Sequence, residues 1–175
     1  MERSIQNPSP EVIVYRNPAT GEVLGEVPVT TPAQVEQAAQ RARAAWPSWR
    51  SMPFRSRADL LLAGRDKLLA NLESFVQRLC VETGKVRGDA LADLMPLCDT
   101  IGYFAKNGED ILSEEPISAH LIKHKKTRVA YHPRGVVVNI SPWNFPVDLS
   151  LTPAMVALLA GNVVLLKPSE ITPSV

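Results

Sequence analysis

The segment from residue 135 to residue 166 constrains the fold more than any other part of the sequence. Two apolar runs, residues 136–140 and 163–166, flank an apolar segment at about 146–160, and Gly161-Asn162 supplies a helix cap before the second run. Neither run alternates with polar residues, which is typical of parallel strands covered on both faces. The segment predicts a β-α-β unit, and therefore an α/β fold.

Polar residues follow both predicted strands directly. Trp143 and Asn144 lie in the turn SPWNFP after the first strand, and KPSE, from Lys167 to Glu170, follows the second. The carboxyl ends of neighbouring parallel strands meet at one edge of a sheet, so we expect these residues to line one crevice. The turn is not GxGxxG, so this stretch lacks a conventional dinucleotide phosphate cradle.

Each of these residues also has a purely structural interpretation. A lone asparagine in a proline-flanked loop is often turn chemistry, so Asn144 could simply shape its turn. Lys167 and Glu170 could form a solvated ion pair that contributes under about 1 kcal/mol. Trp143 and Phe145 could belong to the core.

The first 116 residues predict a β-hairpin followed by a helical layer. Strands flank the turn Asn17-Pro18-Ala19-Thr20-Gly21, and Thr31 and Gln34 form a capping box around Pro32. Further helices are predicted from about Ser56, over 72–85 with a stop near Gly84, and after Gly88. The predicted apolar faces are Val35, Ala38, Ala39, Ala42 and Ala45 on the first helix, and Leu91, Leu94, Met95, Cys98, Ile101 and Ala105 on the last.

Between the helices and the β-α-β unit lies a polar, basic segment. Lys123, Lys125, Lys126 and Arg128 are spread along an expected β-ribbon arm, where lysines discourage uncontrolled strand pairing. The predicted divisions are therefore residues 1–116 (hairpin and helical layer), 117–134 (arm, a possible oligomerisation element) and 135–175 (the β-α-β unit).

Composition narrows the classes of partner. The 175 residues are 45% hydrophobic, enough for one domain or part of a larger one, and the net charge of +1 provides no field for nucleic acid or an anionic membrane. No signal peptide or membrane-spanning run is visible, which favours a cytoplasmic location. Cys80, Cys98 and the three histidines have no metal-ligand spacing, so we expect no metal site and structural cysteines.

In combination, SPWNFP, AGNVVLLKPSEITP and the leading NPATGEVLGEVP resemble the aldehyde dehydrogenase superfamily over nearly the whole chain. The resemblance implies an incomplete Rossmann-like NAD-binding domain, and the N-terminal portion of an NAD(P)-dependent enzyme. Such an enzyme oxidises an aldehyde to an acid through a cysteine thiohemiacetal. The family's catalytic cysteine, general-base glutamate and glycine-rich segment would lie outside this sequence, so the chain alone is expected to be inactive.

The resemblance also implies roles for individual residues. Asn144 would donate its amide to the oxyanion, and Lys167 and Glu170 would hold the adenosine ribose of NAD, with NADP also possible. The remaining expected contacts are Ile140, Ser141, Pro142, Trp143 and Ser169 to the cofactor, and Phe145, Leu149 and Thr152 to the aldehyde.

Several alternatives stay open. Pro153 and Asp148 resemble the fatty or aromatic aldehyde branch, whereas the N-terminal hairpin resembles the acetaldehyde-type branch. The chain could instead be a non-catalytic truncated paralogue that assembles with full-length subunits, or could serve acyl-phosphate or acyl-coenzyme A reduction on the same scaffold. The parent enzyme is expected to be a homodimer or homotetramer.

Overall fold

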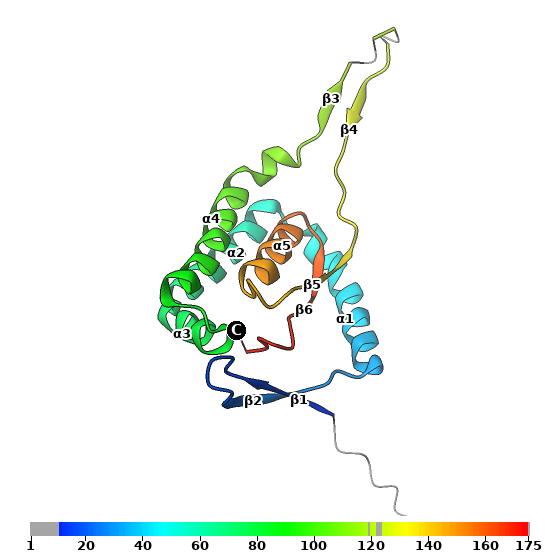
Figure 1. Cartoon of the computed structure of the whole chain (residues 1–175). Coiled ribbons are helices and arrows are strands. Elements are labelled where there is room, and N and C mark those ends of the chain that lie inside the picture. Colours follow the sequence, from blue (N-terminus) through cyan, green and yellow to red (C-terminus); the bar gives the residue numbers. More distant parts are fainter. Residues whose placement is uncertain (1–10, 119, 122–123, 175) are drawn as a thin grey trace, which may run out of the picture.

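A computed structural model describes residues 11–118, 120–121 and 124–174 of the chain, so the prediction for Lys123 lies outside the described residues. Figure 1 shows a central helical body with a hairpin below it and a ribbon standing away from it. The elements are β1 Val12–Arg16, β2 Val23–Pro28, α1 Pro32–Ser51, α2 Phe54–Ala70, α3 Leu72–Thr83, α4 Arg87–Ile111, β3 Glu115–Ile117, β4 Thr127–Val129, β5 Val136–Ile140, α5 Asp148–Leu159 and β6 Val163–Lys167.

The N-terminal hairpin forms as predicted. Strands β1 and β2 pair antiparallel, with an irregularity between Tyr15 and Arg16. Asn17 orders the turn, because its Oδ1 accepts hydrogen bonds from the backbone N–H groups of Ala19 at 2.8 Å and Thr20 at 3.3 Å.

Helix α1 begins with the predicted capping box. The Thr31 hydroxyl accepts the Gln34 N–H at 3.3 Å, and Gln34 Oε1 accepts the Thr31 N–H at 2.8 Å. The predicted apolar face is wrong in part, since Val35 is 52% exposed and no residue of α1 is fully buried. The helix contacts strands β5 and β6, and its two tryptophans donate hydrogen bonds to the end of α5, as described below.

Helices α2, α3 and α4 enclose the core. Helix α3 ends at Gly84, whose φ of 72° is the left-handed conformation predicted for that cap. Leu79, Leu94, Leu97 and Ile101 are among the most deeply buried side chains. Met95 is 68% exposed, so its predicted place on the apolar face is wrong: the buried face of α4 follows the spacing 90, 94, 97 and 101.

The β-α-β unit is confirmed. Strands β5 and β6 pair in parallel, with Val136 opposite Val163 and Ile140 opposite Lys167. Strand β6 extends one residue beyond the predicted end, and α5 begins two residues after the predicted start at Pro146. Helices α1 and α5 both contact this sheet, as the expected cover requires, but the cover is incomplete in the described residues: Val138 is 61% exposed and Ile140 is 70% exposed.

Three long side chains fasten the C-terminal end of α5. The last carbonyls of a helix have no intrahelical partner and need donors from elsewhere. Trp49 and Trp46 donate their indole N–H groups at 3.0 and 3.1 Å, and Arg57 donates from two guanidinium nitrogens at 3.0 and 3.1 Å. Trp49 donates to the Leu158 carbonyl and Trp46 to the Gly161 carbonyl. Arg57 donates to the Leu159 carbonyl.

The predicted arm is a short antiparallel ribbon of β3 and β4 that projects from the body (Figure 1). It begins at Glu115, two residues before the predicted boundary, and all its strand residues are exposed. Arg128 pairs with Glu114 at 2.7 Å across its base. Its role in assembly stays a prediction. Among the described residues, no helix has the length and apolar character needed to cross a membrane.

Candidate functional site

The candidate site is built on the adjacent carboxyl ends of β5 and β6. Ile140 is opposite Lys167 in the ladder, and the Ser141 N–H donates to the Lys167 carbonyl at 3.1 Å. The two polar segments that follow these strands therefore start from one edge of the sheet. The shared edge was predicted from the sequence; that the edge forms a crevice around a ligand stays a prediction.

The turn after β5 presents three side chains to solvent. Trp143 is 52% exposed, Phe145 is 43% exposed, and Asn144 between them is also exposed. Pro146 and Val147, which follow, are buried and anchor the turn to the body. The exposed amide of Asn144 is thus a hydrogen-bond donor flanked by aromatic rings.

Two residues expected to bind a cofactor have buried side chains. The Ser141 and Ser150 hydroxyl oxygens are 2.6 Å apart, which ties the end of β5 to the first turn of α5. Ser169 is 6% exposed, and its hydroxyl accepts the Ile171 N–H at 3.2 Å. Both hydroxyls hold the protein together, so a ligand would meet these residues through their backbones.

Lys167 and Glu170 have the opposite character. Lys167 Nζ lies 2.9 Å from Glu170 Oε2, and the two side chains are 58% and 55% exposed. The hydrogen bond from Lys167 lowers the pKa of Glu170, with a smaller contribution from a backbone hydrogen bond. An exposed pair of this kind contributes little to stability, so both groups remain available to a ligand.

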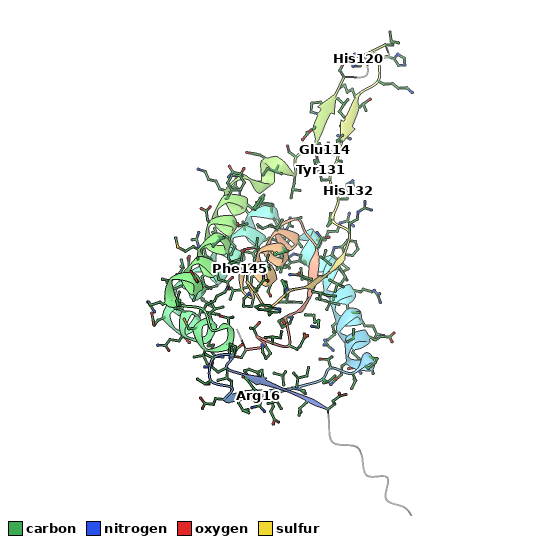
Figure 2. All side chains as sticks on the ribbon, in the orientation of Figure 1. Arg16, Glu114, His120, Tyr131, His132 and Phe145 are labelled. Carbon is green, nitrogen blue, oxygen red and sulfur yellow. The ribbon has the colours of Figure 1, made fainter. Side chains whose placement is uncertain are left out.

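The residues expected to contact a substrate lie at the start of α5 and just before it. Leu149 is 38% exposed, whereas Thr152 is half-buried and its hydroxyl donates to Asp148 Oδ1 at 2.6 Å. Phe145 is labelled over the helical body in Figure 2, and its ring centroid is 4.0 Å from the ammonium nitrogen of Lys85.

Asp93 belongs to this region, although the sequence did not reveal it. This α4 residue is fully buried; its Oδ1 accepts the Asp148 N–H at 3.2 Å and its Oδ2 lies 3.3 Å from Lys85 Nζ. Burial raises the pKa of Asp93, and the Asp148 N–H and Lys85 offset part of that shift. A signal was available, because position 93 lies on the apolar face of α4 beside positions 90, 94 and 97.

Asn139 was also missed. It lies within β5, and its amide donates to the carbonyls of Ser150 at 2.7 Å and Leu149 at 3.3 Å. Pro153 lies inside α5 and has no N–H to give to the Leu149 carbonyl four residues earlier. The sequence contained a signal for this contact. Asn139 is a polar residue in an otherwise apolar strand, and Pro153 in the following helix leaves a carbonyl that needs a donor.

Comparison with known proteins places these features in context. Residues 5–175 match the model of the aldehyde dehydrogenase family. A 4,4'-diapolycopene aldehyde oxidase from a Methylomonas species is 38% identical over 158 residues, which cover 89% of this chain and 30% of that protein. A putative succinate-semialdehyde dehydrogenase [NADP(+)] 2 from Mycobacterium tuberculosis is 39% identical over 154 residues, which cover 88% of this chain and 30% of that protein.

Solved structures agree in fold. A Mycobacterium tuberculosis aldehyde dehydrogenase complexed with NAD+ has a TM-score of 0.85 at 32% identity, covering 95% of this chain and 34% of that one. An NADP-dependent glyceraldehyde-3-phosphate dehydrogenase from Bacillus halodurans, complexed with NADP, has a TM-score of 0.85 at 31% identity. The match covers 93% of this chain and 35% of that one. The chain thus spans about 30% of the length of the curated relatives quoted.

Proposed function

The chain belongs to the aldehyde dehydrogenase family, and we propose that it forms the N-terminal, cofactor-binding part of an enzyme that oxidises an aldehyde to a carboxylic acid with NAD(P). One observation carries the proposal. The turn with Asn144 and the segment with Lys167 and Glu170 leave the same edge of a parallel sheet, because Ile140 and Lys167 are paired. An amide donor and a charged pair are thereby brought to one side of the molecule.

The charged pair fits the ribose of a dinucleotide. The Glu170 side chain is exposed, and its lowered pKa keeps it an ionised acceptor for ribose hydroxyl groups. The ammonium of Lys167 provides a donor at the same place. The names of the relatives support this assignment, since they include enzymes described with NAD+ and with NADP. When bound, the nicotinamide accepts the hydride that leaves the substrate carbon.

The amide of Asn144 fits the acylation step. When a thiolate attacks an aldehyde, the sulfur–carbon bond forms and the carbonyl electron pair moves to oxygen, which becomes an anion. A fixed donor aimed at that oxygen stabilises the transition state by about 2.7–4 kcal/mol. Phe145 and Leu149, exposed beside Asn144 in sequence and at the start of α5, provide apolar surface for the aldehyde.

The test uses a complete enzyme that contains this chain. We expect Asn144→Ala to lower the rate of acylation by about 10²- to 10³-fold and to leave NAD affinity nearly unchanged, because the amide acts on the transition state. Asn107→Ala is the matched control, since Asn107 is half-buried on α4 and its amide donates to the Tyr103 carbonyl of the same helix, away from the sheet edge. Normal single-turnover acylation in Asn144→Ala would leave Asn144 with a turn-forming role alone.

A further inference from the structure

Asp93 is a buried carboxylate that contacts one end of the Phe145–Asp148 segment directly, at the Asp148 N–H, and the other end through Lys85. It is 0% exposed and lies on α4, an element with no part in the site expected from the sequence. A buried carboxylate is costly unless its oxygens are paired, so a position of this kind is informative. Each of its two oxygens has a partner close to the turn that carries Asn144.

The first contact fixes the start of α5. Asp93 Oδ1 accepts the Asp148 N–H at 3.2 Å, and this N–H is one of the unpaired donors at a helix N-terminus. In most helices such a donor is satisfied by a neighbouring residue in the chain. Here the acceptor comes from 55 residues away, so it joins the turn to another helix.

The second contact acts on the residue next to Asn144. Asp93 Oδ2 lies 3.3 Å from Lys85 Nζ, which is 4.0 Å from the centroid of the Phe145 ring. Asp93 therefore holds the ammonium that packs on Phe145. A cation over an aromatic ring is attracted by the ring's negative face, and shielding from water strengthens the attraction. The Lys85 side chain is only 17% exposed.

The other end of the turn is fixed independently. The Ser141 and Ser150 hydroxyl oxygens are 2.6 Å apart, and Asn139 donates to the Ser150 carbonyl at 2.7 Å. These contacts secure the exit from β5 but do not contact residues 143–148. The orientation of Asn144 therefore depends on the segment that follows it, where Pro146 and Val147 are buried and Asp93 acts on the residues on either side of them.

We propose that Asp93 is a positioning residue for Asn144: through the Asp148 N–H and through Lys85 on Phe145, it sets the direction in which the Asn144 amide points. The proposal rests on the proposed function of Asn144 as the oxyanion donor. Asp93 itself does not contact the substrate. A misplacement of about 1 Å can lower a catalytic rate by about 10²-fold, so an error in this support would be visible in the kinetics.

The variants separate the two oxygens of Asp93. Asp93→Asn keeps the shape and one acceptor oxygen, which can serve either the Asp148 N–H or Lys85 but not both. Asp93→Ala removes both contacts. Asp99→Asn is the matched control, because Asp99 is an exposed aspartate on the same helix.

The first measurement is amide hydrogen exchange in the chain itself, and it does not depend on the proposed function. We expect exchange at Asp148 and Leu149 to accelerate at least about tenfold in Asp93→Ala and less in Asp93→Asn. Residues 157–159 should keep their protection, since Trp46, Trp49 and Arg57 hold that end of α5. Unchanged exchange at Asp148 in both variants would overturn the proposal.

The second measurement is a double-mutant cycle on acylation in a complete enzyme. We expect Asp93→Asn to lower the acylation rate by roughly tenfold with NAD affinity unchanged, and to cost little more when Asn144 is already alanine. Full additivity of the two substitutions would show that Asp93 does not act through Asn144. If Asn144→Ala alone leaves acylation intact while exchange at Asp148 responds to Asp93, the proposed function fails and the structural link remains.

Discussion

Asn139 donates its side-chain amide to the Leu149 carbonyl, which Pro153 leaves without an intrahelical donor. The same amide also reaches the Ser150 carbonyl at 2.7 Å. Strand β5 thus supplies the hydrogen bond that the proline removes from α5. The helix can therefore keep a proline in its interior while packing beside the strand that precedes it.

We expect Asn139→Ala to lower the free energy of unfolding by about 1–2 kcal/mol, because the Leu149 carbonyl loses the donor that replaces the proline and the Ser150 carbonyl loses a second hydrogen bond. Pro153→Ala returns an N–H to the Leu149 carbonyl, so it should stabilise the Asn139→Ala chain more than it stabilises the wild type. Urea unfolding of the four chains measures the coupling. Equal effects of Pro153→Ala in both backgrounds would show that Asn139 does not compensate for the proline.

A second prediction concerns cofactor preference in a complete enzyme. We expect NAD to be preferred over NADP, because the Glu170 carboxylate meets the 2′-phosphate of NADP as a like charge, while Lys167 beside it softens the repulsion. Glu170→Gln should raise the ratio of kcat/KM for NADP to that for NAD several-fold. Because exposed charges are screened, the change should shrink in about 1 M salt.

The control for this prediction is Glu109→Gln, an exposed glutamate on α4 that pairs with Arg55 at 2.8 Å. It changes the net charge by the same amount at a distance from the sheet edge. A wild-type enzyme that favours NADP, or a ratio that Glu170→Gln does not move, would remove Glu170 from the ribose site.

Glu82 gives a prediction about pH. This carboxylate is 3% exposed, and it accepts hydrogen bonds from the backbone N–H and the hydroxyl of Ser174. Burial raises the pKa of Glu82, and the Ser174 N–H and Arg78 offset only part of the shift. The folded chain therefore binds the Glu82 proton more tightly than the unfolded chain does.

The sign follows from that difference in pKa. The stabilisation by the neutral acid is fully present below the ordinary glutamate pKa and is lost as pH rises through the raised pKa. We expect the Tm of the wild type to fall relative to that of Glu82→Gln as the pH rises above the ordinary glutamate pKa of about 4.3. A relative rise instead would mean that the hydrogen bonds to Ser174 outweigh desolvation.

The chain's own cysteines give the fourth prediction. Cys98 is half-buried on α4, and burial raises its pKa, so little thiolate is present near neutral pH. In a Cys80→Ala chain, we expect iodoacetamide to alkylate Cys98 more slowly in the folded state than in urea. We also expect no aldehyde-dependent NADH formation by the 175-residue chain. Turnover abolished by Cys98→Ala or Cys80→Ala would contradict the structural role of these residues.

Local patterns predicted the elements well, because the responsible interactions are close in sequence. The Thr31–Gln34 capping box, the Gly84 cap and the strand at 136–140 all depend on neighbouring residues, and the structure confirms them. The edge shared by Asn144 and Lys167 was also predictable, since parallel pairing fixes which ends of two strands meet.

What the sequence concealed depends on partners far away in the chain. In the sequence, Asp93 only interrupts the apolar face of a helix. Its role becomes visible in the structure, where it accepts the N–H of Asp148, a residue 55 positions later in the chain. Periodicity alone could not show which of Met95 and Leu97 is buried, because each fits an apolar face of the helix. The packing of the neighbouring helices determines which face is buried. The exposure of Ile140 was not predictable, because an apolar strand does not reveal how far the neighbouring helices cover it.

The three side chains that fasten the end of α5 also impose an order on folding during synthesis. The carbonyl that accepts from Arg57 is synthesised 102 residues after Arg57. The carbonyls that accept from Trp49 and Trp46 are synthesised 109 and 115 residues after these tryptophans. At about 5–20 residues per second, that interval is roughly 5–20 s. For that time two indoles and a guanidinium stand without their acceptors on helices that have already left the ribosome, and the β-α-β unit can dock only once Gly161 has emerged.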